Sequence, residues 1–73
     1  MEEILINWLT HYTGTDVTMN TAFKDLKFDV FDESMTVDFV DRQFQVNVNI
    51  TEAWFETVKD LLYTIEQNTK WDT

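Results

Sequence analysis

The side chains with the most reactive chemistry gather in one stretch, FDVFDESM, at residues 28–35. It holds Ser34, the only serine of the chain, together with three carboxylates. A calcium loop needs a glycine near its centre, and this region has none, so we exclude calcium. A catalytic site needs a nucleophile, a base and a group that orients the base. His11, the only histidine, has no evident partner for such a role, so we expect a protein that is not an enzyme.

Acidic side chains extend from this stretch in both directions. The cluster comprises Asp25, Asp29, Asp32, Glu33, Asp38 and Asp41. The whole chain has a formal net charge of −9, which argues against nucleic acid and anionic membranes as partners. The charge favours a partner with a basic surface, because opposite charges steer the encounter. It is equally compatible with a solvated surface that keeps a hydrophobic domain soluble.

The length of 73 residues predicts a single domain, 1–73. Cysteine is absent, so no disulfide can form, and a lone histidine argues against a structural zinc site. Stability must therefore come from packing of the many aromatic side chains, from a partner, or from both. No apolar run reaches the roughly 20 residues of a membrane helix. The segment MEEILINWL is acidic where a signal peptide is basic, so we expect a soluble, cytoplasmic protein.

Helical periodicity is clear towards both ends of the chain. The first set of apolar residues predicts a helix over about residues 2–12, and Gly14 follows it as a helix-ending glycine should. A loop is expected from Thr13 to Asn20. Near the other end, Thr57 and Asp60 have the spacing of a helix cap. The apolar positions of the two helices are Ile4, Leu5, Trp8, Leu9 and Tyr12 in the first, and Trp54, Val58, Leu61, Leu62 and Ile65 in the second.

The middle of the chain carries two competing patterns. Apolar residues alternate with polar ones from Phe44 to Ile50, which indicates a strand. Between Phe31 and Phe44 they recur at helical spacing, and this pattern covers more residues. We therefore predict a helix over about 31–45 and an all-α fold of three main helices, with a fourth, short helix near 51–55. The alternative is an α+β fold, in which two helices pack on a β-hairpin.

The middle segment and its flanks resemble the acyl carrier protein family. That family has Phe followed by Asp-Leu, Gly-x-Asp-Ser-Leu-Asp, a long helix, Phe-x-x-x-Ile, and later Thr-Val-x-Asp. The residues at matching positions are Phe23, Asp25, Leu26, Asp29, Phe31, Asp32, Phe44 and Val48, without a gap, then Thr57, Val58 and Asp60 after a shortening of one or two residues. The resemblance spans about residues 4–66 and implies a carrier-like helical bundle that serves fatty-acid or polyketide synthesis without catalysing a reaction itself.

Two positions depart from the family pattern. Val30 stands where the family serine carries 4′-phosphopantetheine, and valine has no hydroxyl for the phosphodiester. Lys27 stands where the family has glycine. Ser34, one helical turn after Val30, is a candidate for a moved attachment site, although serine at this place also suits the N-terminal cap of the following helix. We favour the cap.

The resemblance implies that acids of the second helix dock onto basic surfaces of acyl-processing enzymes such as a ketosynthase. Val30 and Phe31 would add an apolar centre ringed by acids, as in many protein contacts. We expect Val30 to be exposed and Phe31 to be buried. The candidate partner-binding residues are Asp29, Val30, Phe31, Asp32, Glu33, Asp38 and Asp41. The rival interpretation is a small acidic inhibitor or immunity-type protein that binds a basic partner.

Overall fold

The computed structural model describes residues 1–48 and 54–69. Within them the chain forms three α-helices: α1 (Glu2–Thr13), α2 (Val30–Phe44) and α3 (Val58–Asn68). A short 3-10 helix, η1 (Phe23–Leu26), lies in the connection between α1 and α2. The described residues contain no strand, so the all-α prediction is confirmed and the α+β alternative is wrong.

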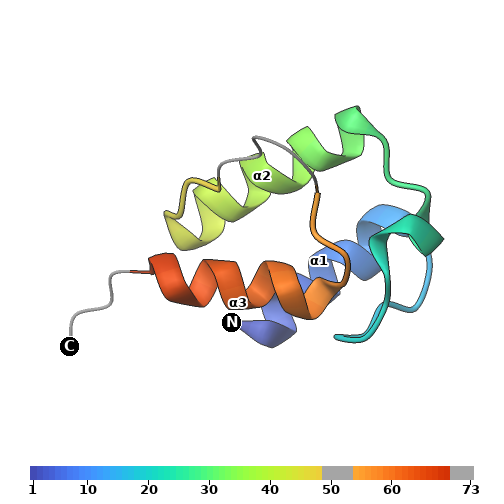
Figure 1. Ribbon diagram of the computed structural model, residues 1–73, viewed down its shortest axis with the longest axis horizontal. Helices are drawn as coiled ribbons and strands as arrows, with labels where there is room; N and C mark the ends of the chain where they lie inside the picture. Colours follow the sequence, from blue (N-terminus) through green and yellow to red (C-terminus); the bar gives the residue numbers. More distant parts are fainter. Residues whose placement is uncertain (49–53, 70–73) are drawn as a thin grey trace.

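Figure 1 shows the arrangement of these elements, in which α2 and α3 extend along the molecule and α1 runs obliquely towards the end where η1 lies and α2 begins. The helices meet around a single apolar core, which the loops complete. The buried apolar side chains are Leu5 and Leu9 of α1, Val17 and Phe23 before α2, Val40 of α2, Val46 and Val48 after it, and Val58, Leu61, Leu62 and Ile65 of α3.

The helix ends follow local signals in the sequence. Gly14 adopts the left-handed conformation (φ 71°), and its N–H donates to the carbonyl of Thr10 at 2.9 Å. At the start of α3, the Thr57 side chain accepts a hydrogen bond from the N–H of Asp60, and the Asp60 carboxylate accepts one from the N–H of Thr57. This reciprocal capping box was predicted from the spacing, and it satisfies two donors that a bare helix end would leave unpaired.

The alternation of apolar and polar residues after α2, which had indicated a strand, does not come from a strand. Val46 and Val48 are buried, whereas Gln45 and Asn47 are exposed, so the segment packs one face on the core without a strand partner. The isolated bridge in the described residues joins Ala22 and Thr57 instead. Of the short helix expected near 51–55, residues 51–53 lie outside the described part of the chain, and the two residues that follow are not helical.

Candidate functional site at the start of α2

The first turn of α2 is held by its own carboxylates. Asp29 is the N-cap: its side chain accepts a hydrogen bond from the N–H of Asp32 at 3.0 Å, while Asp32 Oδ2 accepts one from the N–H of Asp29 at 3.0 Å. This capping box makes Val30 the first residue of the helix. The interpretation of Ser34 as the cap is therefore wrong, because it lies in the second turn, exposed, while Asp29 already fills that role.

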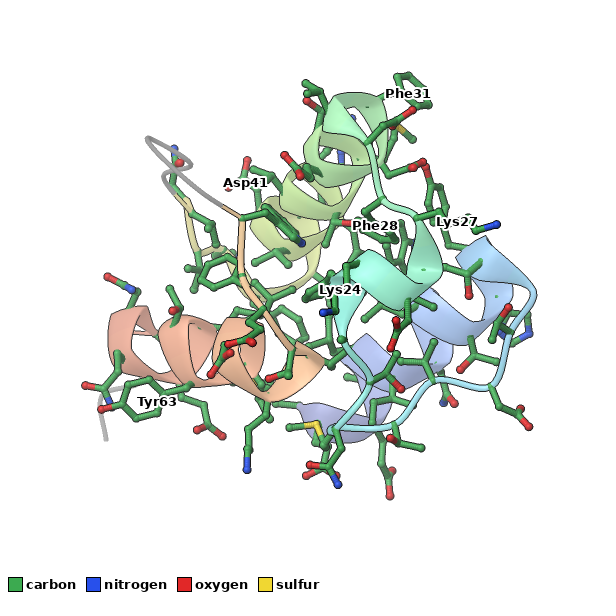
Figure 2. The ribbon with its side chains drawn as sticks, turned by 45° about the vertical axis from the view of Figure 1, so that its right-hand side comes forward. Lys24, Lys27, Phe28, Phe31, Asp41 and Tyr63 are labelled. Atoms are coloured by element: carbon green, nitrogen blue, oxygen red, sulfur yellow. The ribbon has the colours of Figure 1, made fainter. Side chains whose placement is uncertain are left out.

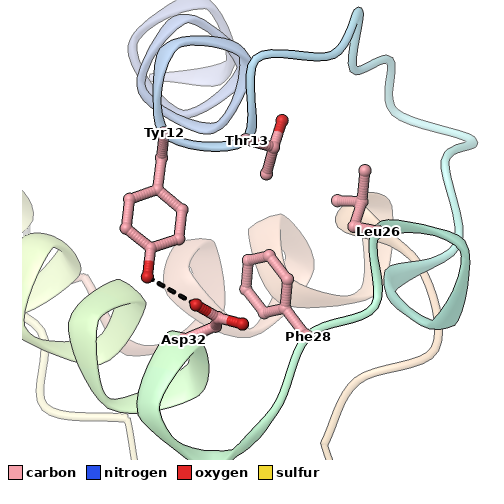
Figure 3. Close-up of a pocket in the computed structure, with 5 residues that line it drawn as sticks. All are labelled: Tyr12, Thr13, Leu26, Phe28 and Asp32. Carbon is pink, nitrogen blue, oxygen red and sulfur yellow. Dashed lines mark hydrogen bonds between the residues drawn. The ribbon is translucent and has the colours of Figure 1, made fainter.

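Asp32 is also tied to α1. The Tyr12 hydroxyl donates to Asp32 Oδ1 at 2.6 Å, which links the last turn of α1 to the first turn of α2 (Figure 3). The hydrogen bond to the carboxylate, with smaller contributions from desolvation and nearby negative charge, raises the pKa of Tyr12 to about 12. The same bond, together with the backbone hydrogen bond at Asp29, lowers the pKa of Asp32. Asp32 is thus a structural carboxylate that stays ionised at neutral pH.

An open pocket of about 350 Å³ adjoins this pair. Figure 3 shows its walls, which come from the end of α1, from η1 and from the start of α2. Tyr12 and Asp32, which line it, already bond to each other, so the pocket presents no unpaired catalytic group from this pair. Its lining residues are Tyr12, Thr13, Leu26, Phe28 and Asp32.

Aromatic stacking keeps α1 and α2 in place around the Tyr12–Asp32 bond. The ring of Trp8 lies between those of Tyr12 and Phe39, with centroid separations of 4.8 and 4.5 Å and interplanar angles of 10° in both pairs. Stacked rings at these separations add attraction beyond their buried area. α2 is therefore fixed to α1 at two points, by the hydrogen bond of Asp32 in its first turn and by the stacking of Phe39 further along the helix.

The tip of α2 presents apolar side chains to solvent. Val30 is 76% exposed, Phe31 66% and Met35 38%. The exposure predicted for Val30 is confirmed, but the burial predicted for Phe31 is wrong. Helical geometry explains the error: Phe31 precedes the fully buried Val40 by nine residues, which places it roughly 180° around the helix from the core-facing side.

The acidic candidates of α2 do not form one uniform surface. Asp29 and Asp41 are exposed, and Asp38 is exposed but paired with Arg42, whose Nε lies 3.0 Å from Asp38 Oδ2. Glu33 is partly buried. Together with the use of Asp32 by Tyr12, this leaves fewer carboxylates available to a partner than the sequence suggested.

Lys27 has a backbone feature that sequence reasoning missed. It ends η1 in the left-handed conformation (φ 57°), with its N–H donating to the carbonyl of Lys24 at 3.1 Å. Non-glycine residues adopt this conformation at a cost. The acyl carrier protein family has glycine at this position, and that glycine could have indicated a left-handed backbone at Lys27.

Comparisons of the chain with protein-family models, with curated proteins and with solved structures find no match. The site must therefore be interpreted from its own geometry. Within the described residues, no helix is long and apolar enough to cross a membrane, and no cluster of three or more potential metal ligands occurs.

Proposed function

We propose that this chain is an acyl-carrier-protein-like docking domain that works without a cofactor at the usual attachment position. The observation that carries the proposal is the start of α2: Asp29 caps the helix and Val30 is its exposed first residue. In the resembling family this position belongs to the modified serine. With valine at this position, the exposed surface remains available for partner contact, but there is no hydroxyl to which 4′-phosphopantetheine could be attached.

Two further features support this proposal. Lys27 has the left-handed backbone that suits the family glycine, and α2 carries exposed acids that can steer a basic enzyme surface. The partner class we propose is an acyl-processing enzyme of cytoplasmic fatty-acid or polyketide synthesis, such as a ketosynthase. The domain would hold or regulate such an enzyme, and the chemistry would belong to the partner.

Ser34 defines the other form of the proposal, in which the arm has moved by one turn. Its side chain is exposed, and no described hydrogen bond uses its hydroxyl. It lies in the second turn of α2, however, and not at the helix entrance, which is where the resembling family carries its arm. We therefore place the cofactor-free form first.

The test is intact-mass analysis after incubation with a promiscuous phosphopantetheinyl transferase and coenzyme A. The wild type, Val30→Ser and Ser34→Ala are compared. We expect no gain on the wild type and a gain of one arm, mapped to residue 30, on Val30→Ser. A gain on the wild type that Ser34→Ala abolishes would establish the moved site. If Val30→Ser folds and stays unmodified, the carrier proposal fails and the acidic inhibitor becomes the better interpretation.

A further inference from the structure

Three apolar side chains project from one end of α2, and we call them the apolar knob: Val30, Phe31 and Met35. Phe31 and Met35 are four residues apart and lie on the same side of the helix. Figure 2 shows Phe31 extending from the end of α2, away from the body of the molecule. Among the described residues, none of the three belongs to the apolar core or packs against it. The residues of α2 that do are the buried Thr36 and Val40 and the partly buried Val37, Phe39 and Phe44.

The charges around the knob identify the chemistry of what covers it. Next to the knob, Asp29 is exposed, and the exposed Lys27 lies two residues before it. Asp41 is exposed too and has no ion pair in the described residues, but it lies eleven residues along α2 from Val30, about 16 Å by helical rise, so it adds to the negative charge of α2 and not to the edge of the knob. A second copy of the chain would bring another nine net negative charges against this end. A partner with an apolar surface flanked by lysine or arginine fits the knob, the adjacent Asp29 and the net negative charge of the chain.

We propose that the apolar knob, rather than the acidic residues, supplies most of the affinity for such a basic, apolar protein partner. Exposed charge pairs add little binding energy, and they act mainly on orientation and encounter rate. A large aromatic side chain that becomes desolvated at the centre of a contact contributes far more. Two of the α2 carboxylates are moreover engaged within the molecule, Asp32 with Tyr12 and Asp38 with Arg42. This inference rests on the docking role proposed above but needs no cofactor.

The chain offers a matched pair of variants that separates the two contributions. Phe31→Asp removes the centre of the knob and makes the protein more acidic. Tyr63→Asp makes the same change in charge at an exposed aromatic residue of α3, 62% exposed and far from Phe31 in Figure 2. Docking driven by charge predicts that both variants bind a basic partner more tightly. Docking driven by the knob predicts a loss for Phe31→Asp alone.

The probe is a synthetic amphipathic helical peptide of lysine and leucine, titrated into the ¹⁵N-labelled protein and followed by NMR. A glutamate–leucine peptide of the same pattern is the control. We expect the basic peptide to shift the amides of residues 30–35, Phe31→Asp to weaken binding by at least about tenfold, or about 1.4 kcal/mol, and Tyr63→Asp to weaken it little or not at all. Phe31→Ser, which adds no charge, should also weaken binding, and amide dispersion checks that each variant folds.

Equal effects of Phe31→Asp and Tyr63→Asp, tighter binding by Phe31→Asp, shifts centred away from residues 30–35, or no binding would each overturn the inference. The outcome is distinct from that of the carrier proposal. An unmodified Val30→Ser protein would end the carrier proposal and leave this titration valid. A titration in which the amides of residues 30–35 do not shift would end the docking inference, whether or not the transferase modifies Val30→Ser.

Discussion

Replacing Lys27 by glycine should stabilise the protein. The residue ends η1 with φ 57°, a conformation in which the Cβ of an L-residue crowds the backbone. Glycine lacks that atom and adopts the left-handed region freely. The left-handed backbone is needed there because it turns the chain from η1 into the extended N-cap Asp29.

The size of the gain follows from two opposing contributions. The left-handed conformation costs an L-residue about 1–2 kcal/mol. Glycine loses more conformational freedom on folding, which offsets about 0.5–1 kcal/mol of that gain. The difference of these ranges puts the net stabilisation of Lys27→Gly between 0 and about 1.5 kcal/mol, with a central value of about 0.75 kcal/mol. For a domain of this size, the central value corresponds to a rise in Tm of about 3–6 °C.

Thermal and urea unfolding, followed by circular dichroism, measure this effect. Lys27→Ala is the matched control, because it removes the same charge and keeps a Cβ at the left-handed position. We expect the order of stability to be Lys27→Gly above wild type, and wild type equal to or above Lys27→Ala. If the glycine variant is no more stable than the alanine variant, the left-handed conformation at residue 27 is not the one present in solution, and the reasoning fails.

Three other perturbations test the same end of the molecule. The pKa of Tyr12 is raised from 10.0 to about 12 in the folded state. The stability that its hydrogen bond contributes should therefore be complete below about pH 10 and lost as the pH rises through about 12. In urea titrations between pH 9 and 12, Tyr12→Phe should accordingly lose less unfolding free energy than wild type does. Asp29→Ala should cost about 0.5–2 kcal/mol of unfolding free energy through loss of the cap, whereas Asp29→Asn, which keeps a side-chain acceptor, should cost less; equal losses would mean that the cap bond is not formed. Val30→Ser should change the unfolding free energy by no more than about 0.5 kcal/mol, as expected for an exposed side chain, and a larger loss in denaturant unfolding would show that Val30 is packed.

The parts of the fold that local signals specify were predictable from the sequence. The helix expected over residues 2–12 is α1, with its end set by Gly14, and the Thr57–Asp60 capping box opens α3 as its spacing indicated. These features depend on residues three or four apart, so periodicity and capping rules suffice to find them. The middle helix was also found, although its predicted bounds of 31–45 are shifted by one residue towards the C-terminus relative to α2.

The features that were missed depend on contacts distant in the sequence. Helical spacing alone did not reveal that Thr36 and Val40 face the core, which turns Phe31 outward. Nothing local pairs Tyr12 with Asp32, twenty residues later, so Asp32 was interpreted as a docking acid. The alternation of Val46 and Val48 was ambiguous because a connecting segment that packs one face on helices can bury every second residue, just as a strand does.

The central claim is that α2 begins at Val30 and turns Phe31 to solvent. The most direct measurement is the paramagnetic relaxation of the aromatic ring protons of ¹³C-labelled protein in the presence of a soluble, uncharged gadolinium chelate. The Phe31 ring, 66% exposed, should relax strongly, while that of Phe23, 2% exposed, stays protected. Equal protection of the two rings would contradict the account, because Phe31 would then belong to the core and the apolar knob would not exist.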